Sequence, residues 1–338
     1  MCISNNNYPT PAVDFNDTIL LGLEVKNPQG DVEHICGYYN KVKTTVTPSS
    51  SDFGLSLKPP AFPGDFGWDI APAAAKKGNA MLIAIPAVPG TVNRDSLIPT
   101  AGFSSFMQDY KTALVPPAPK SRGISFGANF MGDSVEVVKG FDGGLYDVVI
   151  ASSATLIKTV IEKVDEAKRP EINEKLYGQL AIAYPKWTFV LFCFEEADAE
   201  KAGCALVKYK PMRPDYLYLP GLDGHNGEIE RGQVALDHTL VVGSYRAKSG
   251  VGKHVTFSDR EIAFKQPYFL LDRVTGRIIP AGTKAPQGDF LFRLEDVQKG
   301  DFRCKRALPP NWNALGFGTP DGDPWIITEP ERQPYMSE

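Results

Sequence analysis

Residues 145–194 read LYDVVIASSATLIKTVIEKVDEAKRPEINEKLYGQLAIAYPKWTFVLFCF. The two ends of this stretch are short apolar runs, whereas the interior mixes apolar and charged residues with the period of a helix. The pattern predicts a strand, two helices and a second strand. Because an apolar helix face must be buried, the helical pair, at about 152–183, is expected to cover one face of a sheet.

The boundaries of the two helices follow from local chemistry. Ser152 and Ser153 are good N-cap residues for the first helix, which we expect to run to residue 167. Pro170 suits the first turn of the second helix, where a missing N–H costs nothing, and Tyr184-Pro185 ends that helix. The whole unit is a candidate crossover connection, whose right-handed form would set its two strands in one sheet.

Outward from this segment, most signals are those of short strands. Thr18–Val25 and Val32–Tyr39 flank the turn NPQGD and predict a hairpin, and Ala80–Pro86 predicts a buried strand. After residue 205 the chain alternates short strands with turns, one of which we place at DRVTGR, residues 272–277. The fold class that follows is α+β: mostly antiparallel β-sheets, with the helical pair inserted between strands and many loops rich in proline and glycine.

The length of 338 residues allows one large domain or two closely packed halves. The stretch VPPAPK, residues 115–120, favours an extended backbone and is the best candidate for a linker. We therefore predict an N-terminal half rich in β-strands and loops at 1–120. An α+β half at 121–338 would contain the helical pair and end in a β-rich region. One continuous domain is the alternative.

Composition and charge restrict the partners and the compartment. With 36 basic and 40 acidic residues the net charge is −4, which gives no reason to expect nucleic acid as a partner. No apolar run approaches the roughly 20 residues that cross a bilayer, and residues 1–17 lack the features of a signal peptide. Five dispersed cysteines without a CxxC pair indicate reduced thiols. We expect a soluble cytoplasmic protein, for which a homo-oligomer or a protein partner stays open.

The richest chemistry lies in residues 222–238, LDGHNGEIERGQVALDH, which hold two of the four histidines. Their glycines permit positive φ and close backbone approach, so a short loop can direct several side chains at one point. Imidazole and carboxylate groups together serve acid–base catalysis or metal binding. The candidate catalytic residues are Asp223, His225, Glu228, Asp237 and His238.

A divalent metal such as zinc or manganese would suit this set, with Asp223, His225 and His238 as ligands and an open position that activates water. The resulting hypothesis is a metal-assisted or acid–base hydrolase. It requires Asp223 and His225 to meet Asp237 or His238 in space. The spacing matches neither HEXXH nor an EF-hand, so a loop whose polar side chains only cap turns is the competing interpretation.

Two further function classes stay open. A non-catalytic binding or self-assembling structural protein would use the aromatic stretch 53–68 and the tryptophans Trp312 and Trp325 as apolar surface. An N-terminal-nucleophile hydrolase would use Cys2 after removal of Met1, with the freed α-amino group as base. The residues that follow Cys2, ISNNNYP, lack the β-rich run expected around such a nucleophile.

Overall fold

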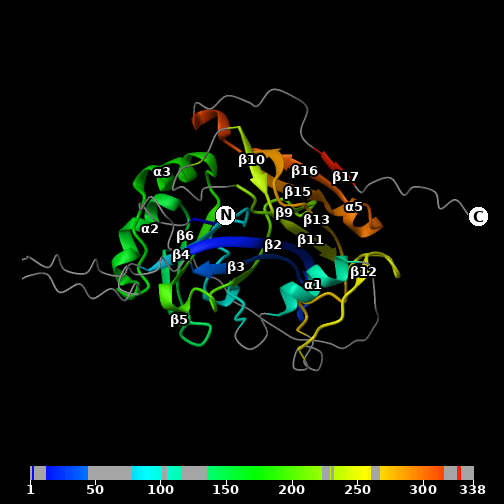
Figure 1. The fold of residues 1–338 in the computed structure, drawn as a ribbon, viewed down its shortest axis with the longest axis horizontal. Coiled ribbons are helices and arrows are strands. Elements are labelled where there is room, and N and C mark those ends of the chain that lie inside the picture. Colours follow the sequence, from blue (N-terminus) through cyan, green and yellow to red (C-terminus); the bar gives the residue numbers. More distant parts are fainter. Residues whose placement is uncertain are drawn as a thin grey trace, which may run out of the picture.

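The computed structural model describes residues 2–3, 13–44, 78–100, 105–115, 135–222, 229, 232–259, 267–315 and 326–328. The four sheets that the described residues form (Figure 1) all contribute one face to a single apolar core. The first sheet has the order β1-β4-β7-β6-β5, and all its neighbouring strands are antiparallel. Its strands are β1 (Cys2–Ile3), β4 (Asn79–Ile85), β5 (Glu136–Phe141), β6 (Tyr146–Ala151) and β7 (Thr188–Phe194).

The six-stranded sheet has the order β12-β13-β11-β2-β3-β8 and contains one parallel pair, β11 with β2, among the described strands. Its strands are β2 (Val13–Lys26), β3 (Val32–Thr44), β8 (Cys204–Tyr209), β11 (Thr239–Ser244), β12 (Lys253–His254) and β13 (Arg273–Ile278). Strands from before and after residue 120 therefore lie side by side. The predicted hairpin is confirmed, because β2 and β3 pair antiparallel.

The four-stranded sheet positions the site described below. Its order is β17-β16-β15-β9, with every pair antiparallel. Its strands are β9 (Tyr216–Leu219), β15 (Asp289–Arg293), β16 (Arg303–Ala307) and β17 (Ile326–Thr328). A separate two-stranded sheet pairs β10 (Gln233–Leu236) with β14 (Thr283–Pro286).

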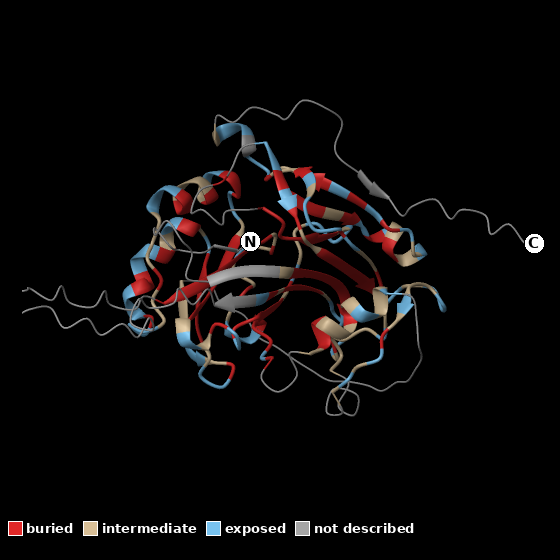
Figure 2. Cartoon of the chain, viewed as in Figure 1, coloured by how far each residue is buried: buried red, intermediate tan, exposed pale blue. Residues whose placement is uncertain are grey.

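Helices cover the outer faces of the two largest sheets. The helices α2 (Ala154–Val160) and α3 (Glu174–Ala183) pack on the five-stranded sheet, and α1 (Phe106–Leu114) packs on the six-stranded sheet. A short helix, α5 (Leu294–Lys299), follows β15. Buried residues fill the strands, whereas exposed residues lie on the outer sides of the helices and in turns (Figure 2). In the described ranges the chain also forms the 3₁₀ helices η1 (Arg94–Ser96), η2 (Ile161–Lys163), η3 (Glu196–Asp198) and η4 (Trp312–Leu315).

The α+β class and the mostly antiparallel sheets are confirmed, and four local predictions are wrong. Pro170 does not open the second helix, because Asn173 is its N-cap and accepts a hydrogen bond from the Leu176 N–H at 3.0 Å. The strands β6 and β7 are neighbours but antiparallel, so their connection is not a parallel crossover. The stretch DRVTGR is not a turn, since most of it lies in β13. The first helix also ends before the predicted residue 167, because it changes to 3₁₀ geometry at Ile161.

None of the helices in the described ranges combines the length and the apolar character that a membrane crossing requires.

Candidate functional site

The loop that carries the sequence-predicted site is described only at its two ends. Asp223, His225 and Glu228 lie outside the described residues, so their proposed meeting with Asp237 or His238 stays a prediction. Asp237 Oδ2 accepts a hydrogen bond from the Asp17 N–H at 2.9 Å, and its Oδ1 lies 3.4 Å from His238 Nδ1. Across the part of the chain that the structure describes, no three His, Cys, Asp or Glu side chains gather as a metal site would require.

One cysteine, Cys2, lies in a strand at the edge of a sheet, and the other four are buried. Cys2 lies in β1 and pairs with Met81 in register, so it does occupy a strand, although its side chain lies outside the described residues. The others, Cys36, Cys193, Cys204 and Cys304, are buried as free thiols. Burial raises the pKa of Cys193, so this thiol stays protonated in the core, as its apolar strand predicts.

The entrance to the 222–238 loop is held by a carboxylate that sequence reasoning missed. Asp289 Oδ1 accepts hydrogen bonds from the N–H groups of Gly221 and Leu222 at 3.0 and 3.1 Å, and Oδ2 accepts one from the Tyr184 hydroxyl at 2.7 Å. Burial raises the pKa of Asp289, and these hydrogen bonds together with the nearby Arg306 oppose that rise. The carboxyl thus acts as a structural anchor.

Arg306 completes this anchor from the neighbouring strand. Its Nη2 donates to the carbonyl of Gly221 at 3.1 Å and its Nε donates to the carbonyl of Pro286 at 2.8 Å. The guanidinium also lies over the ring of Phe290, 4.2 Å from its centroid. Both the amide and the carbonyl side of Gly221 are therefore fixed by buried side chains of β15 and β16.

A cavity of about 500 Å³ lies against the outward face of the four-stranded sheet. Its floor follows from strand register, because Leu291 of β15 pairs with Tyr218 of β9 on one side and with Lys305 of β16 on the other. Residues directly opposite in neighbouring strands point to the same face. We call this cavity the aromatic pocket; it is lined by Pro86, Trp187, Tyr209, Pro211, Met212, Arg213, Tyr216, Tyr218, Asp289, Leu291, Lys305, Ala307, Leu308 and Pro310.

The walls of the aromatic pocket are aromatic side chains that contact neighbouring side chains of the lining. Trp187 meets Tyr218 edge to face with ring centroids 4.9 Å apart, and Arg213 lies over the Tyr216 ring at 4.7 Å. Arg213 is itself held by Asp215 through two contacts of 3.0 and 2.8 Å. Burial, together with the charge of the neighbouring Asp289, raises the pKa of Tyr218, so its hydroxyl stays protonated.

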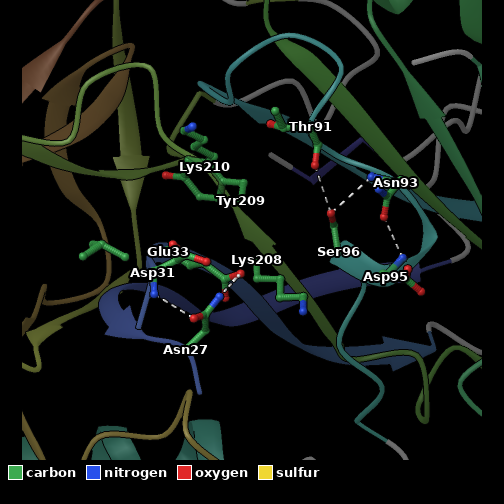
Figure 3. Close-up of a pocket in the computed structure, with 11 residues that line it drawn as sticks. Asn27, Asp31, Glu33, Thr91, Asn93, Asp95, Ser96, Lys208, Tyr209 and Lys210 are labelled. Atoms are coloured by element: carbon green, nitrogen blue, oxygen red, sulfur yellow. Dashed lines mark hydrogen bonds between the residues drawn. The ribbon is translucent and has the colours of Figure 1, made fainter. Parts of the chain in front are cut away.

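A second cavity, of about 460 Å³, lies where the β2–β3 turn, the η1 segment and the end of β8 meet (Figure 3). We call it the polar pocket; its lining residues are Asn27, Asp31, Val32, Glu33, Thr91, Asn93, Asp95, Ser96, Lys208, Tyr209 and Lys210. Several of these groups bond to one another. Asn27 Oδ1 accepts from the Asp31 N–H at 2.8 Å, and Asn27 Nδ2 donates to Glu33 at 3.2 Å. The polar side chains of this pocket therefore stabilise the turn between β2 and β3.

A row of polar side chains crosses the six-stranded sheet beside both pockets. In register, Ser244 pairs with Glu24, Glu24 with His34, and His34 with Tyr209. The fully buried Glu24 carboxylate is paired with Arg246 and accepts a hydrogen bond from Ser244. Burial lowers the pKa of His34 to about 4, with Glu24 opposing and Arg246 reinforcing the shift. Neither His34 nitrogen has a hydrogen-bond partner among the residues that the structure describes.

Comparison with known proteins leaves the family open. No protein-family model matches the chain, and no curated protein matches it. Among solved structures, baculovirus P35 matches with a TM-score of 0.38 and 11% identity, over 84% of this chain and 90% of that one. A mutated P35 after caspase cleavage gives 0.36 and 14%, over 67% of this chain and only 65% of that one. The caspase-8/P35 complex gives 0.35 and 14%. These values are too low to assign a family or a function.

Proposed function

We propose that this chain is a non-catalytic binding protein whose aromatic pocket holds a small, flat aromatic ligand. The observation that carries the proposal is the convergence of four rings, those of Trp187, Tyr209, Tyr216 and Tyr218, around one cavity of about 500 Å³. Ligand pockets typically enclose about 300–1,000 Å³ and are lined mainly by apolar and aromatic groups around a few polar ones.

The polar groups of this pocket favour binding over catalysis. A general base needs a carboxylate oxygen within hydrogen-bond reach of the substrate. At the pocket, Asp289 already accepts three hydrogen bonds, from Gly221, Leu222 and Tyr184. The raised pKa of Tyr218 keeps its hydroxyl from acting as a base at neutral pH. The side chains are thus arranged to shape the cavity.

The first test uses N-phenyl-1-naphthylamine, a neutral fluorescent compound with a flat aromatic body. We expect one molecule to bind with a dissociation constant on the order of 100 µM or tighter, given typical ligand efficiencies. The variant Ala307→Trp would fill the cavity from β16, where Ala307 lines it. Fluorescence titration should show at least about tenfold weaker binding to this variant.

Arg303→Trp is the matched control. Arg303 lies on the same strand and, four residues before Ala307, on the same face of the sheet. It is exposed and does not line the pocket. Its substitution should leave binding unchanged. Equal titrations for the wild type and Ala307→Trp, or no binding to the wild type, would show that the cavity is not a ligand site.

A further inference from the structure

We propose that the ligand of the aromatic pocket is a planar aromatic anion whose charged group lies against Lys305. This inference rests on the proposed binding function and adds the ligand's charge and its orientation. It follows from the strand register at the pocket floor, from the charges at its rim and from the contrast with the polar pocket.

The register fixes where a charge would lie relative to the rings. Tyr218, Leu291 and Lys305 are directly opposite one another on three adjacent strands. Neighbouring strands lie about 4.8 Å apart, so Lys305 stands roughly 10 Å from Tyr218 across the floor. A ligand with two fused or linked rings spans that length. Its apolar body would cover Leu291, and one end would reach the lysine.

The charges at the rim favour an anion at the Lys305 end. Arg213 and Lys305 both line the cavity. Arg213 is neutralised by its two contacts with Asp215, whereas within the described ranges no carboxylate forms an ion pair with Lys305. Asp289 lies two residues before Leu291. Its carboxylate accepts three hydrogen bonds and is close to the positive charge of Arg306. The ammonium group of Lys305 is therefore the charge that a ligand would meet.

The polar pocket does not offer the same combination. Lys208 and Lys210 lie there among three carboxylates, those of Asp31, Glu33 and Asp95, and Tyr209 is the only aromatic residue among the described residues of its lining. An aromatic anion would meet repulsion at that site and little apolar surface. Lys208 consequently serves as a charge-matched control for Lys305.

The test compares two probes that differ by one charged group. 8-Anilinonaphthalene-1-sulfonate carries the ring system of N-phenyl-1-naphthylamine plus a sulfonate. We expect the wild type to bind the sulfonate about 3–5-fold more tightly than the neutral compound, the size of a solvent-exposed ion pair. Lys305→Met should abolish this preference, which is the ratio of the two dissociation constants within one variant, so that a change in apolar packing common to both probes cancels. Lys305→Arg should retain the preference.

Salt and the control variant complete the test. Raising the salt from about 20 mM to 500 mM should shrink the preference in the wild type, because exposed charges are screened. Lys208→Met should behave as the wild type does. Equal binding of both probes by the wild type, or an unchanged preference in Lys305→Met, overturns the anionic ligand while leaving the pocket intact. Failure of the neutral compound to bind instead overturns the binding function itself.

Discussion

Replacing Asp289 with alanine is expected to lower the free energy of unfolding by about 3–5 kcal/mol. The change removes the acceptor for the Gly221 and Leu222 amides and for the Tyr184 hydroxyl, all at 2.7–3.1 Å from the carboxylate. It also removes a negative charge close to the buried Arg306. Each orphaned buried polar group costs about 1–3 kcal/mol, and water cannot easily replace the lost partner. Urea denaturation with linear extrapolation measures the loss.

Two companion variants make this result interpretable. Asp215→Ala removes a carboxylate of the same kind, but from an exposed pair with Arg213, and should cost less than about 1 kcal/mol. Asp289→Asn keeps an oxygen that can accept from the two amides, so its cost should fall between the two alanine variants. If Asp289→Ala and Asp215→Ala lose equal stability, the anchor described for the loop entrance does not exist.

Helices and strands of this fold were predictable where neighbouring residues alone determine them. The strand β7 is a continuous apolar run and is buried along its whole length, and the NPQGD turn sets the β2–β3 hairpin. By contrast, two residues compete for the start of the second helix: Pro170 suits a first turn, and Asn173, three residues later, is a good N-cap residue. Capping depends on one side-chain hydrogen bond, which a periodic pattern does not reveal.

The misplaced turn at DRVTGR has a packing reason. Glycine usually interrupts a strand pattern in sequence, yet Gly276 lies in the middle of β13. A Cβ at this position would lie 2.3 Å from the Leu240 carbonyl oxygen and 2.6 Å from Leu114 Cδ1 of α1. The glycine therefore allows two backbones and a helix to approach closely. Only the tertiary neighbours distinguish that role from a turn.

The aromatic pocket was not predictable for a related reason. The stretches YLYL and DFLFR are typical of short strands bounded by turns. Nothing in the sequence shows that Tyr218 is opposite Leu291 and that Leu291 is opposite Lys305. Register depends on all contacts of the sheet. The hydrolase hypothesis for residues 222–238 depends on convergence in the same way, and it stays a prediction.

Acid is expected to destabilise this protein through His34. The pKa of this fully buried imidazole is lowered to about 4, against about 6.5 in an unfolded chain. Between these two values the unfolded state binds a proton that the folded state does not, so stability falls as the pH falls from 6.5 to 4 and is retained above 6.5. The shift corresponds to about 3 kcal/mol lost by the lower end of that window.

A phenylalanine substitution isolates this contribution from those of the carboxyl groups. The His34 ring packs edge-on against Tyr209, with centroids 5.8 Å apart, and within the described part of the chain its nitrogens have no hydrogen-bond partner. His34→Phe therefore keeps the ring contact and orphans no other polar group. Its free energy of unfolding should match or exceed that of the wild type at neutral pH, and the difference should grow by about 3 kcal/mol toward pH 4. The matched control is His254→Phe, which makes the same substitution in the short strand β12. Parallel pH profiles for the wild type and His34→Phe would mean that Glu24, which faces His34 across β2 and β3, keeps the imidazole readily protonated in the folded protein.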